Sequence, residues 1–252
     1  MKKQHILITN DDGINAEGIN HLTEMLSDSY RLTIVAPEYP QSGKSHSITT
    51  DRGLRIDKKE QFNGHMRYSV HGTPADCVKI ALQCIINDLP DMVISGINDG
   101  TNTGNSAFYS GTVGAALEGS FFGIPSIALS LCTEQGKEKN FRNADLLLTN
   151  LIDNTLNSFK GKGICFNVNI PNVLTVKGIK YCRQTKGAWK ERFEKTTDEN
   201  NNESFWLKGD YINEEPDSND TDEWAVKNNY IAVVPLSTDL TCFRTLEKMK
   251  KR

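Results

Sequence analysis

The chain begins with a strand, a helix and a second strand, and this order constrains its fold more than any other feature. Residues 5–10 (HILITN) form a short apolar run, and residues 31–37 (RLTIVAP) form another that ends at a proline. Between them, residues 16–27 carry apolar side chains at helical spacing. Strand, crossover helix and strand make a βαβ unit, which requires a parallel sheet with a right-handed crossover. The sequence therefore predicts an α/β fold.

The same alternation of apolar strands and helices continues along the chain. Two short strands, 52–57 and 66–71, are expected to form a hairpin around Asn63-Gly64. The other predicted elements are strands at 91–98, 126–131, 164–171 and 230–236, helices at 74–87, 112–122 and 144–159, and a basic tail with helical character. The 252 residues suit one large α/β domain, or a main domain with an appendage.

Composition limits the classes of partner. The formal net charge is −3 and the pI is about 6.0, so no global basic field favours a nucleic-acid polymer. No apolar run is long enough to span a bilayer, and the N-terminal run is too short for the core of a signal peptide. We expect a cytoplasmic protein that binds neither nucleic-acid polymers nor membranes.

The cysteines predict neither disulfides nor a zinc site. They are scattered, with no two of them in the paired spacing that zinc sites use. In a long chain without an export signal, we expect reduced structural thiols. The six are Cys77, Cys84, Cys132, Cys165, Cys182 and Cys242.

The composition changes after about Lys186. Residues 187–224 are strongly polar, with scattered aromatic residues, and such a stretch cannot build a core of its own. We expect an extended arm, with a hairpin tip near 198–204, that packs on the main domain or on a second subunit. Its tryptophans are expected to be interface anchors rather than a ligand cage; they are Trp189, Trp206 and Trp224.

Three polar loops follow the first, second and third core strands. They are NDDG (10–13), PEYPQSGKSHS (37–47) and GINDGTNTGNSAFYSGT (96–112). Ligands of open parallel sheets bind outside the carboxyl ends of the strands, near the point where the strand order reverses. We therefore expect the three loops to converge on one crevice.

Asp11 and Asp12 are candidate metal ligands. Adjacent residues of a strand point to opposite faces, so two neighbouring carboxylates can share a ligand only where the strand has ended. Gly13 allows that turn, and two like charges this close require a cation or protons. Carboxylate oxygens select hard cations such as Mg²⁺ or Mn²⁺. The alternative is a pair of solvated turn residues, one of them capping the next helix.

The other two loops carry candidate phosphate ligands. Small hydroxyl residues around Gly43 can donate to phosphate, although such a loop is more often an ordinary surface turn, and His46 is more often a solvated side chain than an acid or base. In the third loop, Asn98 can offer an amide oxygen to a metal, and the residues from Ser110 to Thr112 lie where a helix begins. Helix N-termini bind phosphate, although simple N-capping explains the same residues.

Six motifs in series resemble the SurE (survival protein E) family of nucleotidases. They follow the family's order over nearly the whole chain, and together they are far more specific than any one of them. The motifs are NDDGINAEGI (10–19), APEYPQSGKSHSIT (36–49), GTPADCV (72–78), DMVISGINDGTNTGNSAFYSGTVGAALEG (91–119), GIPSIALS (123–130) and YIAVVPLSTDLT (230–241). Two further segments, WKERFEK (189–195) and FWLKGD (205–210), resemble the halves of the family's hairpin.

The resemblance implies a Rossmann-like, mostly parallel sheet with helices on both faces, plus a C-terminal β-hairpin arm. It divides the chain into a catalytic core (1–185), an oligomerisation arm (186–229) and a C-terminal strand and helix (230–252) that can exchange between subunits. A homodimer or homotetramer is expected. The implied activity is metal-dependent hydrolysis of nucleoside 5′- and 3′-monophosphates, with some action on short-chain polyphosphate.

The resemblance also assigns roles to individual residues. One divalent ion per subunit, Mg²⁺ or Mn²⁺, is expected on Asp11, Asp12, Ser42 and Asn98. The phosphate-binding positions are Gly43, Ser45, Asn102, Ser110, Gly111 and Thr112. The catalytic residues are expected to be Asp11, Asp12 and Asn102, with Asp11 orienting or deprotonating the attacking water.

Two rival functions remain open from the residues. One is an aspartyl-phosphate phosphatase of the haloacid-dehalogenase type, although that chemistry uses two aspartates separated by one position, whereas here they are adjacent. The other is a nucleotide-binding module without turnover, which the crowded set of metal-type and phosphate-type residues disfavours.

Overall fold

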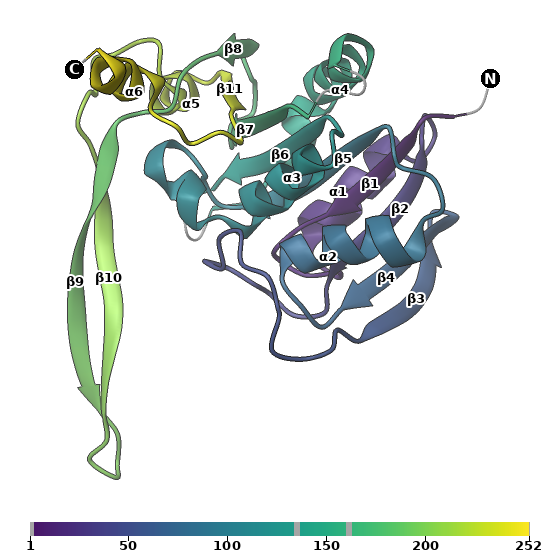
Figure 1. The fold of residues 1–252 in the computed structure, drawn as a ribbon, viewed down its shortest axis with the longest axis horizontal. Helices are drawn as coiled ribbons and strands as arrows, with labels where there is room; N and C mark the ends of the chain where they lie inside the picture. Colours follow the sequence, from purple (N-terminus) through teal and green to yellow (C-terminus); the bar gives the residue numbers. More distant parts are fainter. Residues whose placement is uncertain (1–2, 134–136, 160–162, 252) are drawn as a thin grey trace.

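The computed structural model describes residues 3–133, 137–159 and 163–251 (Figure 1). The strands of its main sheet are β1 (His5–Thr9), β2 (Arg31–Pro37), β3 (Ile56–Phe62), β4 (His65–Val70), β5 (Met92–Asp99), β6 (Ser126–Cys132), β7 (Cys165–Pro171), β8 (Ile179–Tyr181) and β11 (Ile231–Leu236). The helices are α1 (Glu17–Leu26), α2 (Pro74–Ile80), α3 (Gly111–Phe121), α4 (Asp145–Phe159), α5 (Asp222–Lys227) and α6 (Phe243–Lys250). Shorter turns are the π-helix η1 (Ala81–Ile85) and the 3₁₀-helices η2 (Gly104–Tyr109) and η3 (Phe141–Ala144).

The main sheet is mostly parallel, as predicted. Its strand order is β3-β4-β2-β1-β5-β6-β7-β11-β8. Parallel pairing runs without interruption from β4 to β7, whereas β3 lies antiparallel to β4 and β11 lies antiparallel to β7. The strand order reverses at β1, whose neighbours are β2 on one side and β5 on the other. The crevice expected of such a fold therefore lies beyond the ends of β1, β2 and β5.

Helices cover both faces of the sheet, as the predicted fold class requires. On β1, Ile6 and Ile8 pack in one apolar cluster with Leu22 of α1 and Leu148 of α4. The intervening Leu7 belongs to the opposite cluster, which includes side chains from α2 and α3. This alternation follows from the two-residue period of a strand that is buried on both sides.

Several boundaries differ from the sequence prediction. The predicted strand 52–57 is β3 at Ile56–Phe62, and its turn is at Asn63-Gly64 as expected, with φ of 49° and 77°. The predicted helix 74–87 ends as α2 at Ile80 and continues only as the π-turn η1. The elements β8, α5 and η2 were not predicted, because each is short and borrows its stability from neighbouring segments.

The arm is a two-stranded hairpin of β9 (Gly187–Thr197) and β10 (Glu203–Asn213), which projects away from the main sheet in Figure 1. Its outer residues are largely exposed. The next helix, α5, returns to the core and contacts β11 and β7. At the end of the chain, α6 buries none of its residues.

Two further expectations concern the cysteines and the membrane. All six cysteines are free thiols, in agreement with the prediction. Among the described residues, no helix is long and apolar enough to cross a membrane.

The packing of α1 on β5 generates the first testable prediction. A Cβ at Gly18 would collide with the carbonyl oxygen of Ile97, which is backbone and cannot rotate away. We expect Gly18→Ala to lower the free energy of unfolding by about 1–3 kcal/mol, the usual cost of overpacking, in urea denaturation. The control is Gly53→Ala, whose Cβ would meet no atom within 4 Å. Equal stability of the two variants would contradict this packing.

Candidate active site at the carboxyl edge of the sheet

A cavity of about 670 Å³ lies at this edge of the sheet. Its lining comes from the loops that follow β1, β2 and β5, so the three predicted loops do converge. From these loops it is lined by Asp11, Ser42, Gly43, Asn98, Asp99, Gly100, Thr101, Asn102, Ser106, Tyr109 and Ser110. The arm adds Trp189, Glu191, Leu207, Lys208 and Gly209.

Asp11 is the most buried carboxylate of the site, with only 4% of its surface exposed. Burial raises its pKa from 3.8 to about 6, against the lowering effect of a hydrogen bond from the Thr112 hydroxyl; the charge of Asp12 raises it further. A Cβ at Gly111 would lie 2.9 Å from Cβ of Asp11. The start of α3 is therefore built closely around this side chain.

Asp12 lies beside the end of β5. Its Oδ2 accepts a hydrogen bond of 3.1 Å from the backbone N–H of Asp99, and burial raises its pKa. Asp99, which sequence analysis did not single out, is itself paired with Lys139 at 2.5 Å. Asp12 is not among the residues that line the cavity, but its carboxylate is fixed to one that is. The β1 and β5 loops are thus joined through Asp12.

The loop after β2 is hydrogen-bonded both to the loop after β1 and to η2. The backbone N–H of Gln41 donates to the carbonyl oxygen of Asp11 at 2.7 Å. Ser45 turns toward η2, where its hydroxyl donates to the carbonyl oxygen of Phe108 at 2.5 Å and its N–H donates to that of Tyr109 at 3.0 Å. These contacts hold Ser42 and Gly43 at the cavity wall.

Asn98 and Asn102 are held by different contacts. Nδ2 of Asn98 donates to the carbonyl oxygen of Gly100 at 2.9 Å, so its amide oxygen is the atom that suits a cation. Asn102 is buried, and its Nδ2 donates to Oγ of Ser130 at 2.8 Å. Its backbone N–H donates to the side chain of Asn169, also at 2.8 Å. Asn102 is therefore anchored on the neighbouring strands β6 and β7.

The beginning of α3 combines both interpretations offered by the sequence. Oγ of Ser110 accepts a hydrogen bond of 3.1 Å from the N–H of Val113, so Ser110 is the N-cap, and it also lines the cavity. The hydroxyl of Thr112 donates a hydrogen bond to Oδ1 of Asp11. In the first turn of this 11-residue helix, the N–H of Val113 donates to Ser110 and that of Thr112 donates to Asp11, so the N–H of Gly111 is the one that suits an anion.

The donor set fits a divalent cation. Asp11 and Asp12 place two adjacent carboxylates in a partly desolvated position, where a cation would relieve both burial and mutual repulsion. Ser42 and Asn98 add a hydroxyl and an amide oxygen at the same cavity. Carboxylate, hydroxyl and amide oxygens are the ligands of hard cations such as Mg²⁺ and Mn²⁺.

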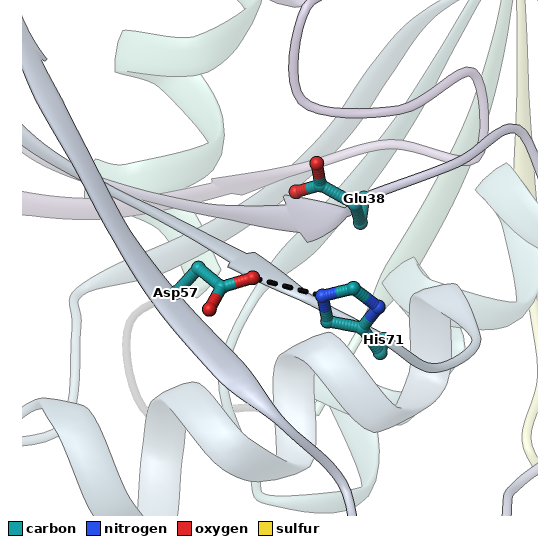
Figure 2. Close-up of side chains that lie close together, drawn as sticks. All are labelled: Glu38, Asp57 and His71. Atoms are coloured by element: carbon teal, nitrogen blue, oxygen red, sulfur yellow. Dashed lines mark hydrogen bonds and ion pairs between the residues drawn. The ribbon is translucent and has the colours of Figure 1, made fainter.

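A second cluster also has metal-ligand chemistry. Ligand atoms of Glu38, Asp57 and His71 all lie within 4.8 Å of one another (Figure 2). However, Lys59 Nζ lies 2.7 Å from Glu38 and Arg55 Nη2 lies 2.9 Å from Asp57. These cations already neutralise the carboxylates, and the hydrogen bonds of Arg55 and His71 lower the pKa of Asp57 to about 2. The cluster is an ion-pair network whose carboxylates already have cationic partners.

His46 lies apart from the cavity. Its Nε2 is 2.9 Å from Oε2 of the buried Glu118, which also pairs with Lys79, and its ring stacks on Phe121 with centroids 5.3 Å apart. Two partners, Glu118 and Phe121, hold the imidazole against α3. It is therefore neither the solvated side chain expected from the sequence nor part of the cavity lining.

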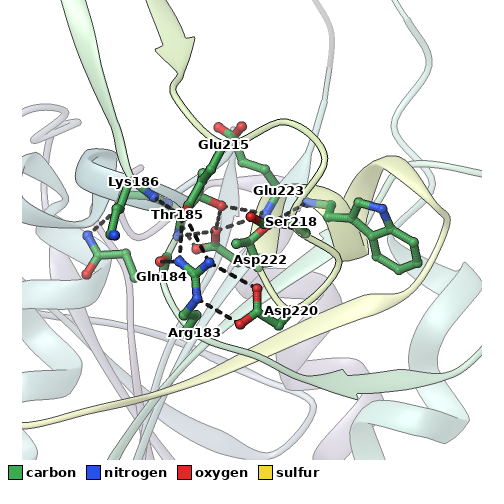
Figure 3. Close-up of polar contacts among 12 residues, drawn as sticks. Arg183, Gln184, Thr185, Lys186, Glu215, Ser218, Asp220, Asp222 and Glu223 are labelled. Carbon is green, nitrogen blue, oxygen red and sulfur yellow. Dashed lines mark hydrogen bonds and ion pairs between the residues drawn. The ribbon is translucent and has the colours of Figure 1, made fainter.

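The base of the arm is fixed to the core by a polar network (Figure 3). The buried carboxylate of Asp222 accepts from the N–H of Thr185 at 2.9 Å and from its hydroxyl at 2.5 Å. It also accepts from the N–H of Gly104 in η2, at 2.9 Å. Arg183 donates to Asp220 and Glu215 on the far side of the same network. This network sets the position of the arm wall relative to the cavity.

Comparisons of the sequence and of the structure with known proteins find the same family. The family model described as "Survival protein SurE" matches residues 6–191. A "5′-nucleotidase SurE" of Cytophaga hutchinsonii is 40% identical, covering 100% of this chain and 97% of the relative. One of Phocaeicola vulgatus is 37% identical, covering 99% and 98%. The crystal structure of the SurE protein from Aquifex aeolicus is 37% identical, with a TM-score of 0.82 and 98% coverage of each chain.

The raised pKa of Asp11 generates a prediction about stability. The folded state binds the proton of the Asp11 carboxyl more tightly than the unfolded state does. The free energy of unfolding therefore falls as the pH rises from about 4 to about 6, and it stays lowered above pH 6. With EDTA present at pH 8, we expect Asp11→Asn to unfold with a free energy higher by roughly 1–3 kcal/mol, because the amide carries no charge. Urea denaturation at pH 8 and pH 5 should show this advantage shrinking at the lower pH. A loss of stability at pH 8 would contradict the assignment.

Proposed function

The chain belongs to the SurE family and is by that membership a 5′-nucleotidase, and we propose that it uses one divalent metal ion per subunit, Mg²⁺ or Mn²⁺, to release phosphate from nucleoside 5′- and 3′-monophosphates. One observation carries the proposal. Asp11 and Ser42, from the loops after β1 and β2, and Asn98, at the end of β5, line the same cavity at the point where the strand order reverses. Three oxygen ligands gathered at such a crevice suit a phosphate ester that is neutralised by a cation.

We assign the metal to Asp11, Asp12, Ser42 and Asn98. When bound there, the cation would neutralise phosphoryl oxygens and lower the pKa of a water molecule. The protein contributes the position of its ligands. Thr112 holds Asp11, the Asp99 N–H holds Asp12, and Gly100 holds the amide of Asn98.

The phosphate would be held mainly by backbone N–H groups. Those of Gly43 and Gly111 belong to the cavity loop and to the first turn of α3, where the helix dipole favours an anion. Ser110 and Thr112 flank Gly111, but their N–H groups donate to Ala107 and Asp11. Asn102 adds the second hydrogen of its Nδ2, since the first is donated to Ser130. Ser45 contributes by holding the Gly43 loop against η2 through its two hydrogen bonds.

The proton acceptor is assigned to Asp11. Asp11 lines the cavity beside Ser42 and Asn98, so its carboxylate is within reach of a water molecule held at the proposed cation. We propose that Asp11 orients the attacking water and accepts its proton, while Asp12 and Asn102 fix the geometry of the reacting group. Pre-positioning of this kind supplies a large part of the rate in phosphoryl transfer.

The wider substrate range and the assembly are also proposals. The cavity exceeds what one phosphate needs, so short-chain polyphosphate is a second substrate class, and the cytoplasm is the proposed location. We propose a homodimer or homotetramer formed through the arm, whose Phe193 and Phe205 are 67% and 59% exposed. The C-terminal segment 230–252 would exchange between subunits, since α6 buries none of its own residues.

Activity should separate the two acidic clusters. In a phosphate-release assay with AMP and Mn²⁺, we expect Asp11→Asn to lower kcat/KM by at least about 100-fold, since loss of even an indirect metal contact costs about 10–100-fold. Asp57→Asn is the matched control from the second cluster and should stay close to wild type. EDTA should abolish the wild-type rate, and Mn²⁺ or Mg²⁺ should restore it.

The opposite pattern would overturn the metal assignment. Full activity after exhaustive chelation, or in Asp11→Asn, excludes a cation at this pair. Loss of activity in Asp57→Asn alone would move the metal to the Glu38 cluster. A phosphoryl group trapped on Asp11 would favour the aspartyl-phosphate mechanism, and tight AMP binding without phosphate release would favour a binding module.

The arm makes the assembly testable by mass. We expect Phe193→Ser combined with Phe205→Ser to reduce the molar mass in light scattering at micromolar concentration, because exposed aromatic residues of this kind anchor interfaces. The control is Lys190→Ser, on the same strand and also exposed. An unchanged mass in the double variant would show that the arm does not hold the subunits together.

A further inference from the structure

The register of the hairpin determines which arm residues share a face. Trp189 pairs with Tyr211, Glu191 with Gly209, and Phe193 with Leu207. In antiparallel strands, directly opposite residues project to the same side, as do residues two apart along each strand. Trp189, Glu191, Leu207 and Gly209 therefore lie on one face, and all four line the active-site cavity. This face is named the inner arm face.

The inner arm face is held in place at its base. The ring of Tyr211 meets that of Trp189 edge-on, with centroids 5.8 Å apart. The hydroxyl of Tyr211 fills the space where a Cβ of Gly104 or Gly187 would lie, so arm and η2 are in direct contact. Asn105 of η2 also donates to the carbonyl oxygen of Gly187. The orientation of Trp189 is thus set by the core rather than by free motion of the hairpin.

The two walls of the cavity have different chemistry. The core wall carries the carboxylate, hydroxyl and amide groups assigned to the metal and the phosphate. The inner arm face offers an indole and a leucine, with Gly209 packed closely against the backbone of Lys190 and Glu191. Lys208, which projects from the other face of its strand, also lines the cavity. Trp189 remains 40% exposed, so part of its ring is available to a ligand. An exposed indole beside a leucine, facing a phosphate site, matches a substrate with an aromatic group attached to its phosphate.

Glu191 indicates which part of the substrate faces the arm. A carboxylate close to the phosphate would repel it, so Glu191 belongs at the other end of the ligand. There it can accept hydrogen bonds, and ribose hydroxyls and base N–H groups are the donors that a nucleoside offers. The carboxylate of Glu191 therefore favours the nucleoside end of the substrate at the inner arm face.

We propose that the inner arm face is the nucleoside subsite of this enzyme, with the base stacked on Trp189 and Glu191 accepting hydrogen bonds from the nucleoside. The proposal rests on the nucleotidase function proposed above and adds the residues that select the leaving group. It changes the expectation for Trp189, which sequence analysis treated as an interface anchor. The arm then serves substrate selection as well as assembly.

The test compares a substrate that has a base with one that lacks it. Phosphate release from AMP and from ribose 5-phosphate is measured with Mn²⁺ for wild type, Trp189→Ala and Trp189→Phe. We expect Trp189→Ala to raise KM for AMP about ten-fold, within the range of base–aromatic stacking, with kcat little changed. The kinetics with ribose 5-phosphate should not change, and Trp189→Phe should restore most of the affinity for AMP. The matched control is Trp206→Ala, a more exposed tryptophan (59% against 40%) on the opposite face of the same arm.

Binding can be followed without turnover. Adenosine, which has no phosphate, should quench tryptophan fluorescence in wild type and in Trp206→Phe but not in Trp189→Phe. An unchanged KM for AMP in Trp189→Ala, or equal losses with AMP and ribose 5-phosphate, would overturn the subsite. Failure of the nucleotidase proposal itself is distinguishable, because wild type would then release phosphate from neither substrate.

Discussion

The carboxyl edge of this protein depends on the burial of one charged side chain, Asp11. Its carboxylate lies where the strand order reverses, almost out of contact with solvent, and its pKa rises to about 6 as a result. Such a group is unfavourable in a folded protein unless a partner compensates it. Thr112 does so in part, and the close approach of Gly111 shows that the start of α3 is shaped around it. The proposed cation completes the compensation, so binding the metal and stabilising the fold are linked.

That constraint explains why the surrounding loops are tied together. The loop after β2 donates to the backbone of Asp11, and the loop after β5 donates to Asp12. Each contact restricts the conformational freedom of a polar segment that has little apolar surface to bury. A site built from three loops holds its geometry only if the loops hold one another, since ligands must be fixed closely to act on a reacting group.

Much of this edge was predictable because the determinants are local or topological. The apolar runs of β1, β2 and β5 fix the parallel sheet, and the sheet brings the ends of these strands together whatever the details of the loops. The positions of Asp11, Ser42 and Asn98 at one cavity follow from that alone. Boundaries were less predictable: β3 starts at Ile56 rather than at residue 52, because a polar edge strand has no apolar pattern to mark its start.

Contacts between distant segments were the part that sequence could not supply. The backbone N–H of Asp99 donates to Asp12, and a contact made by the backbone cannot be recognised from the type of residue. The pairing of His46 with Glu118 joins residues 72 positions apart. The role of Trp189 depends on the register of the hairpin, and a shift by one residue would turn its side chain to the other face of the arm. A polar segment with scattered aromatic residues is compatible with Trp189 on either face of the arm.

The register of the arm also links selection and assembly. Phe193 lies on the inner arm face with Trp189, one step beyond Glu191 along the strand, and it pairs with Leu207. A second subunit that covered Phe193 would therefore contact the same face of the arm that borders the cavity. Such a partner would restrict the motion of the hairpin, and less entropy would then be lost when a base binds against Trp189. Assembly would then tighten nucleoside binding without adding a contact to the phosphate site.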